Sequence, residues 1–254
     1  MKSVIIESMK AQLPAVSLPS ARLLLSGAVG STLNGIDKES SDVDRMAVYA
    51  YSMEAVIRSL VGVSNTKDSF FNSDPDVFGY DVGRITELLM KSNAPVLNFL
   101  HSDSFEFSTP LGLELAEMAK SRLLTLDGLF RVIPASAMAS YKESVYNADR
   151  ESMDYSTRIS ETPKNVARKL KVAFVQISQA KQALDIGFYR TQVPNREFFL
   201  NDYPDMTYLE ATELFAAEHQ ALKARSRENL NFKEIYNDED VEVMRDWVVR
   251  SRSF

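Results

Sequence analysis

Three of the nine glycines in this 254-residue chain, Gly27, Gly30 and Gly35, lie within nine consecutive positions. They follow a compact apolar run at residues 21–26 that is bounded by turn residues, a pattern that predicts a buried strand. Glycine tolerates left-handed backbone conformations and lets a ligand approach the main chain closely. The sequence therefore predicts a buried strand that ends in a sharp turn at which the backbone itself is accessible.

The residues at this turn have a possible binding role. Ser31 offers a hydroxyl and a backbone N–H directly after Gly30, and if a helix starts here its first N–H groups suit a phosphate. On its own, a Gly-Ser pair after a strand is more often an ordinary turn, so phosphate binding at Gly30 and Ser31 needs support from elsewhere in the chain.

That support comes from two acids, Asp42 and Asp44, at the start of a second predicted strand over residues 43–51. Residues two apart on a strand project from the same face, which would set the two carboxylates side by side. Like charges that close repel unless a cation lies between them. An isolated Asp-x-Asp is more often a solvated turn followed by an exposed strand residue.

Composition limits which metal could bind. The chain has no cysteine and only two histidines, His101 and His219, so any metal must be held mainly by oxygen ligands, which favours Mg²⁺ or a similar hard cation. We expect His101 to be structural. Further along the chain, Asp76 opens a short strand predicted at residues 76–80. Asp81 follows that strand, and its place before a helix is explained by N-capping.

The order of these motifs resembles the nucleotidyltransferases of the polymerase β type, and more narrowly the RNA-repair-pathway DNA polymerase beta family, which is frequent in bacteria and phages. The resemblance rests on Gly30-Ser31-x-x-x-Gly35 followed by Ser41-Asp42-Val43-Asp44, and on the block from Asp76 to Arg84 with Leu88 to Leu97. It continues more loosely through a later helix over residues 170–187. Ala94 and Asn98 depart from the family pattern, which leaves the acceptor-binding details open.

The resemblance implies transfer of a nucleoside monophosphate from an NTP to an acceptor hydroxyl, with release of pyrophosphate. The resemblance also implies a third acid on a neighbouring strand, for which Asp76 is favoured because it opens a strand, and Asp81 is the alternative. Asp42 and Asp44 would hold two Mg²⁺ or Mn²⁺ ions and Asp76 one of them, while Gly30 and Ser31 would cradle the phosphates. The family implies an RNA end as acceptor, for example that of a cleaved tRNA. Two alternatives stay open: an enzyme that nucleotidylates (AMPylates) a protein, and a non-catalytic member that binds a nucleotide or a partner protein.

Several basic residues are further candidates for nucleotide binding. Arg45 and Arg84 could pair with the acids or contact a phosphate. Lys164, Arg168 and Lys171 share one face of a helix predicted over residues 165–186, and could contact a triphosphate or an RNA backbone. A solvated basic face explains the last three slightly better.

The elements predict an α+β (mixed α/β) fold. A nucleotidyltransferase domain at residues 1–110, with a small mixed sheet, would precede a helical domain at residues 111–254. We expect helices over residues 5–13, 53–60, 208–227 and 238–250, a helix after Asp81 that ends before Pro95, and a loop over residues 65–75. The net charge of -6 means that the chain lacks the excess of basic over acidic residues that is typical of nucleic-acid-binding proteins. Without a signal peptide or a membrane-spanning stretch, we expect a soluble cytoplasmic protein.

Overall fold

The computed structural model describes residues 21–37, 43–62, 66–73, 76–225, 230 and 232–254. The contacts divide the chain into two units, one built on a sheet and one helical. The sheet unit comprises residues 1–33, 37–123 and 236–254, and the helical unit residues 34–36 and 124–235. The α+β fold is therefore confirmed, and the predicted helix over residues 5–13 lies outside the described residues.

The described residues of the sheet unit form one five-stranded sheet in the order β3-β4-β2-β1-β5. β1 is antiparallel to β2 and to β5, β2 is parallel to β4, and β3 is antiparallel to β4, so the sheet is mixed. The apolar run of β1 is buried from Leu23 to Leu25, as the sequence predicts. The strands are β1 (Ala21–Ala28), β2 (Arg45–Tyr51), β3 (Ser69–Ser73), β4 (Asp76–Asp81) and β5 (Phe107–Ser108).

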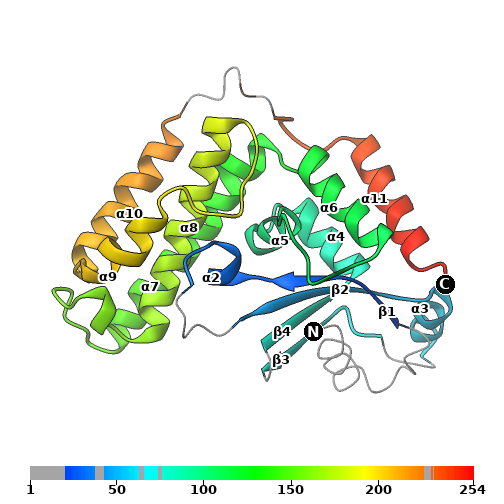
Figure 1. The fold of residues 1–254 in the computed structure, drawn as a ribbon, viewed down its shortest axis with the longest axis horizontal. Coiled ribbons are helices and arrows are strands. Elements are labelled where there is room, and N and C mark those ends of the chain that lie inside the picture. Colours follow the sequence, from blue (N-terminus) through cyan, green and yellow to red (C-terminus); the bar gives the residue numbers. More distant parts are fainter. Residues whose placement is uncertain (1–20, 38–42, 63–65, 74–75, 226–229, 231) are drawn as a thin grey trace. The chain divides into compact units, whose positions relative to one another are not determined.

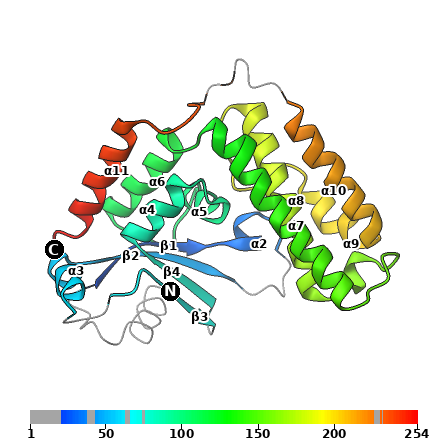
Figure 2. The same cartoon turned by 180° about the vertical axis from the view of Figure 1, so that it is seen from behind.

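Helices α4, α5 and α6 lie on the same side of this sheet in both views (Figures 1 and 2). α6 approaches β1 so closely that a Cβ on Gly112 would clash with the carbonyl oxygen of Leu24. The predicted helix after Asp81 ends at Met90, and Pro95 lies in the first turn of the next helix. The helices of this unit are α2 (Gly30–Leu33), α3 (Met53–Leu60), α4 (Val82–Met90), α5 (Ala94–Leu100), α6 (Pro110–Arg122) and α11 (Asp238–Ser251).

The expected loop over residues 65–75 is wrong, because it contains the edge strand β3. Phe70 and Phe71 alternate within a polar stretch, and Phe70 is buried against Tyr49 on β2. The polar neighbours hid this alternation, since an edge strand needs only one buried face. β3 therefore depends on pairing with β4, which the local sequence does not reveal.

The C-terminal helix α11 belongs to the sheet unit. The indole N–H of Trp247 donates to the carbonyl oxygen of Leu111 at 2.9 Å, and Arg250 pairs with Glu114. These contacts attach α11 to α6 across more than a hundred residues of sequence. The contact units therefore differ from the predicted ranges 1–110 and 111–254, since both α6 and α11 pack with the sheet.

The helical unit is centred on the antiparallel packing of its two longest helices, α7 and α8. α8 ends at Ile186 and is followed by Gly187, whose φ of +78° is the left-handed conformation common after a helix C-terminus. Within the described ranges, no helix of either unit is long and apolar enough to cross a membrane. The unit contains π-helical turns at Gly128–Val132 and Phe198–Asp202, a 3-10 turn at Ile159–Glu161, and α7 (Ile133–Arg150), α8 (Lys164–Ile186), α9 (Tyr203–Asp205) and α10 (Tyr208–Lys223).

Candidate active site

The strand directions bring the predicted motifs to one edge of the sheet. Because β1 is antiparallel to β2, and β2 is parallel to β4, the carboxyl end of β1 lies beside the amino ends of β2 and β4. Gly30 and Ser31 follow the end of β1, Asp44 precedes the first residue of β2, and Asp76 is the first residue of β4. Asp42 lies outside the described residues, so its placement stays a prediction.

The turn after β1 holds Asp44 against the backbone of Gly30. The backbone N–H of Val29 donates to the carbonyl oxygen of Asp44 at 2.9 Å, which extends the pairing of β1 with β2. Gly30 adopts φ +67°, and a Cβ built on it would lie 3.1 Å from Oδ2 of Asp44. Both the backbone conformation and the tight space favour glycine here. The carboxylate of Asp44 therefore lies directly over the turn that also carries Ser31.

The register of β2 and β4 sets Asp76 beside Asp44. Arg45 pairs with Val77, so continuing the parallel register by one residue places Asp44 opposite Asp76. Paired residues on neighbouring strands point to the same face, with a strand separation of about 4.8 Å. Two carboxylates in this arrangement repel each other unless a cation lies between them.

Asp81, the alternative third acid, lies at the other end of β4. Its Oδ1 accepts the backbone N–H of Gly83 at 2.9 Å and so caps α4. Both of its carboxylate oxygens also accept from the guanidinium of Arg252, with the Nη1 to Oδ2 contact at 3.1 Å. Asp81 is buried and its carboxylate is committed to these partners, which favours Asp76 as the third acid.

Two of the predicted arginines are already paired in this structure. The guanidinium of Arg45 contacts Glu106 at 3.0 Å, and strand alternation directs Arg45 and Asp44 to opposite faces. Arg84 lies in the first turn of α4, beyond the carboxyl end of β4, and pairs with Glu87 at 2.6 Å. The structure therefore brings neither arginine to the face on which Asp44 and Asp76 lie. Their role in nucleotide binding stays a prediction.

The three predicted basic residues of α8 belong to the helical unit. Lys164 and Arg168 are exposed, whereas Lys171 is partly buried and donates to the carbonyl oxygen of Ile36 at 3.4 Å. The helix is confirmed over Lys164–Ile186, and the three residues share one of its faces. Phosphate binding by this face stays a prediction.

Sequence reasoning missed how the segment after α2 is held. Within the helical unit, Nε2 of Gln179 donates to Oδ1 of Asn34 at 3.1 Å, and the hydroxyl of Tyr189 donates to Oε1 of Gln179 at 3.1 Å. The backbone N–H of Val193 donates to the carbonyl oxygen of Asn34 at 3.3 Å. Gln179 and Asn34 are both buried. Two buried amides more than a hundred residues apart leave no local pattern that would reveal this network.

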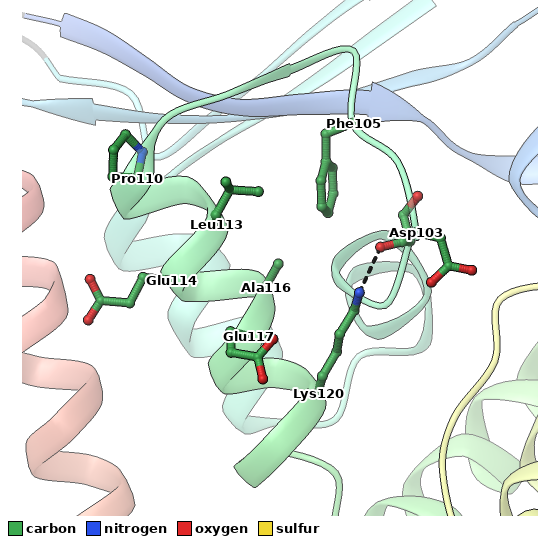
Figure 3. Close-up of a pocket in the computed structure, with 9 residues that line it drawn as sticks. Asp103, Phe105, Pro110, Leu113, Glu114, Ala116, Glu117 and Lys120 are labelled. Carbon is green, nitrogen blue, oxygen red and sulfur yellow. Dashed lines mark hydrogen bonds between the residues drawn. The ribbon is translucent and has the colours of Figure 1, made fainter.

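The sheet unit also has an open pocket of about 420 Å³ beside α6. Figure 3 shows Phe105 and Leu113 on its wall. Nζ of Lys120 donates to the carbonyl oxygen of Ser102 at 2.9 Å. Three acids, Asp103, Glu114 and Glu117, line it together with that single lysine. The excess of negative charge makes this pocket unsuited to a triphosphate.

His101 is structural, as its position in the sequence predicts. It caps the C-terminus of α5, and its Nδ1 lies 2.8 Å from the carbonyl oxygen of Leu97. Burial lowers the pKa of His101 to about 4, against its usual 6.5, so the ring is neutral at physiological pH.

The described acids fit a hard cation by their chemistry, since carboxylate oxygens are the ligands that Mg²⁺ prefers. Asp44 and Asp76 supply two such ligands at adjoining strand ends. Among the residues that the structure describes, which do not include Asp42, no cluster of three potential metal ligands is found. The complete ligand set is therefore a proposal.

Comparison with known proteins gives one family. No curated protein matches the chain. Among solved structures, the crystal structure of a nucleotidyltransferase-like protein from Exiguobacterium sibiricum matches 98% of this chain and 72% of its own length, at 9% identity and a TM-score of 0.28. This similarity is too low to carry an argument about fold or function.

The family model is decisive. The model of the RNA repair pathway DNA polymerase beta family matches residues 1–129, which is more than half of the chain. The matched region contains the turn at Gly30, both strand-end acids that the structure describes, and Asp42. The chain therefore belongs to the RNA repair pathway DNA polymerase beta family and is a nucleotidyltransferase of the polymerase β type.

Proposed function

We propose that this protein transfers a nucleoside monophosphate from an NTP to the terminal hydroxyl of an RNA, of which a cleaved tRNA is the favoured example, and releases pyrophosphate. The observation that carries the proposal is the placement of Asp44 against Gly30, with Asp76 in register on the neighbouring strand. The name of the family, an RNA repair pathway, supports RNA as the acceptor.

Each residue at the sheet edge has a role in this proposal. Asp42 and Asp44 would hold two Mg²⁺ or Mn²⁺ ions, and Asp76 would share the ion nearer the acceptor. When bound, such ions neutralise charge on the phosphates and lower the pKa of an attacking hydroxyl. Gly30 lets a phosphate approach the backbone, and Ser31 donates from its hydroxyl and its N–H to the β- and γ-phosphates.

The reaction balances without any further reactant. The acceptor oxygen forms a bond to the α-phosphorus as the bond from that phosphorus to the bridging oxygen breaks, and pyrophosphate carries away the electron pair. In this proposal Asp76 would also take the proton of the acceptor hydroxyl. The exposed residues Lys164 and Arg168, together with Lys171, would bind phosphates of the RNA backbone or of the NTP.

A labelling experiment tests the proposal. Each of the four α-³²P-labelled NTPs is incubated with the protein, Mg²⁺ or Mn²⁺, and total bacterial RNA and protein, and the transfer of label to each is measured. Asp44→Asn and Asp76→Asn should abolish the labelling of RNA. Asp103→Asn, an exposed acid of the pocket beside α6, is the matched control and should label as the wild type does.

The result also separates the alternatives. Label in protein rather than RNA would replace the RNA acceptor with a protein acceptor. The absence of any label above the Asp44→Asn background, with every NTP and both metals, would reject transfer and leave nucleotide binding as the remaining function.

A further inference from the structure

Two aromatic rings stand exposed on the hairpin formed by β3 and β4. Phe71 pairs with Phe78 across the strands, and their rings stack with centroids 4.6 Å apart at 29°. Phe71 is 48% exposed and Phe78 is 37% exposed. Aromatic residues of this size are normally buried for most of their area, so two adjacent exposed rings are typical of a binding surface.

The stacked pair shares its face with Asp76. Alternation along β4 directs the side chains of Asp76, Phe78 and Tyr80 to the same side. At about 3.4 Å per residue, Phe78 lies about 7 Å along the strand from Asp76. That is roughly two steps of a nucleic-acid strand at about 3.4 Å per nucleotide.

The core does not account for these rings. Phe70, the neighbour of Phe71, points to the opposite face and is buried with Tyr49 and Val77. A cross-strand aromatic pair contributes to hairpin stability, but a buried apolar pair would do so as well. Exposure beside a proposed metal ligand is the feature that needs another explanation.

The exposed face continues along β4 to Tyr80, which is partly buried. The face thus runs from Asp76 over two exposed rings to a third aromatic side chain. Exposed aromatic rings on which successive bases stack are a common means by which proteins bind single-stranded nucleic acid without sequence preference.

We propose that the Phe71–Phe78 pair is a stacking platform for the terminal bases of a single-stranded nucleic-acid acceptor. The inference rests on the proposed function, because Asp76 marks where the acceptor hydroxyl would lie. A terminal base would add a third layer to the two stacked rings, and would so position the end of the strand at Asp76. Stacking is tolerant of base identity, so the platform selects a strand end rather than a sequence.

Binding of a single-stranded 12-nucleotide RNA tests the platform. The probe carries fluorescein at its 5′ end for anisotropy and 2-aminopurine at its 3′ end, whose fluorescence is quenched by stacking. All variants are made in the Asp44→Asn background, which prevents turnover. Phe71→Leu and Phe78→Leu should each weaken binding by about 5-fold or more, the loss of one stacked base, and should reduce the quenching. Phe78→Trp should retain both the RNA binding and the quenching seen with Phe78.

Phe188→Leu is the matched control, because Phe188 is 49% exposed and lies in the helical unit. It should leave binding and quenching unchanged. Unfolding of each variant in urea identifies any change in stability that a purely structural pair would cause. Unchanged binding and quenching in both leucine variants, or losses that only follow their stability, would overturn the platform.

The platform and the proposed function fail separately. Binding and quenching that depend on Phe78, in a protein that transfers no label, would reject the transfer reaction and keep the platform. If the wild type transfers label to RNA but binds the RNA equally well with and without Phe78, the platform alone is rejected. No RNA binding, with label transferred to protein, would reject both the platform and the RNA acceptor.

Discussion

The substitutions Asp81→Asn and Asp76→Asn should have opposite consequences for stability and activity. Asp81 is buried, and its side chain pairs with that of Arg252, the two being 8% and 11% exposed. Removal of one partner from a buried ion pair costs about 3–5 kcal/mol, since the remaining charge is left in a poorly solvated position. The amide introduced by Asp81→Asn keeps an oxygen that can cap α4, so we expect the lower end, about 3 kcal/mol.

For a chain of this length, 1 kcal/mol corresponds to about 2–4 °C in Tm, so Asp81→Asn should lower Tm by roughly 6–12 °C. Asp76 is only partly buried at a strand end, and Asp76→Asn should change stability by no more than about 0.5 kcal/mol. Its effect on transfer should be at least about 100-fold, because losing a ligand to a catalytic metal removes several kcal/mol of transition-state stabilisation.

Differential scanning calorimetry gives the first quantity, and labelling of RNA at a temperature well below both transitions gives the second. Arg252→Lys is the control for Asp81, since it keeps a cation but not the two-pronged contact and should lie between the wild type and Asp81→Asn. An Asp81→Asn protein with wild-type Tm and no transfer activity would refute the assignment and make Asp81 the functional acid.

Three further changes have defined outcomes. The pKa of His101 is the usual 6.5 in the unfolded chain but about 4 in the folded protein. The free energy of unfolding is therefore unaffected by His101 above pH 6.5 and falls as the pH drops toward 4, by about 2 kcal/mol at pH 5. Urea unfolding of His101→Gln should lack this part of the pH dependence, and an unchanged dependence would contradict the burial argument. A glycine-to-alanine substitution normally stabilises a helix by up to about 1 kcal/mol, but the Cβ introduced by Gly112→Ala would meet the Leu24 carbonyl. We therefore expect urea unfolding to show a net loss of stability of about 1–3 kcal/mol. A gain in stability would disprove the clash. Gly30→Ala and Gly62→Ala should each lower the free energy of unfolding by about 1–2 kcal/mol, because both glycines have a positive φ. Only Gly30→Ala should reduce transfer, because Gly62 has open space around it whereas Gly30 contacts Asp44. Equal effects on transfer would mean that the contact with Asp44 is irrelevant.

The elements with a local signal could be predicted from the sequence. β1 has a continuous apolar run, α8 has a helical period over its whole length, and Asp81 precedes α4 as its cap. The turn at Gly30 could be predicted because a glycine cluster after a buried strand is a backbone signal rather than a side-chain one. These features depend on neighbours a few residues away, which a single sequence contains.

Features that depend on distant partners could not be predicted. Arg252 gives no sign in the sequence that it pairs with Asp81, and the edge strand β3 depends on pairing with β4. Arg45 looked available for a phosphate, but its pairing with Glu106 depends on the chain returning after α5. In each case the deciding contact comes from tertiary structure, and local composition carries no information about it.

The insertion of the helical unit between Leu123 and Tyr236 has a consequence for synthesis of the protein. The partner of Asp81 emerges from the ribosome 171 residues after Asp81 itself, which at about 5–20 residues per second is a delay of roughly 10–35 s. During that time the helical unit can be completed, whereas the sheet unit still lacks α11 and leaves uncovered the Asp81 carboxylate and the surface of α6 on which α11 packs. The nascent sheet unit is therefore the part of the chain that most needs protection from aggregation, for example by a chaperone.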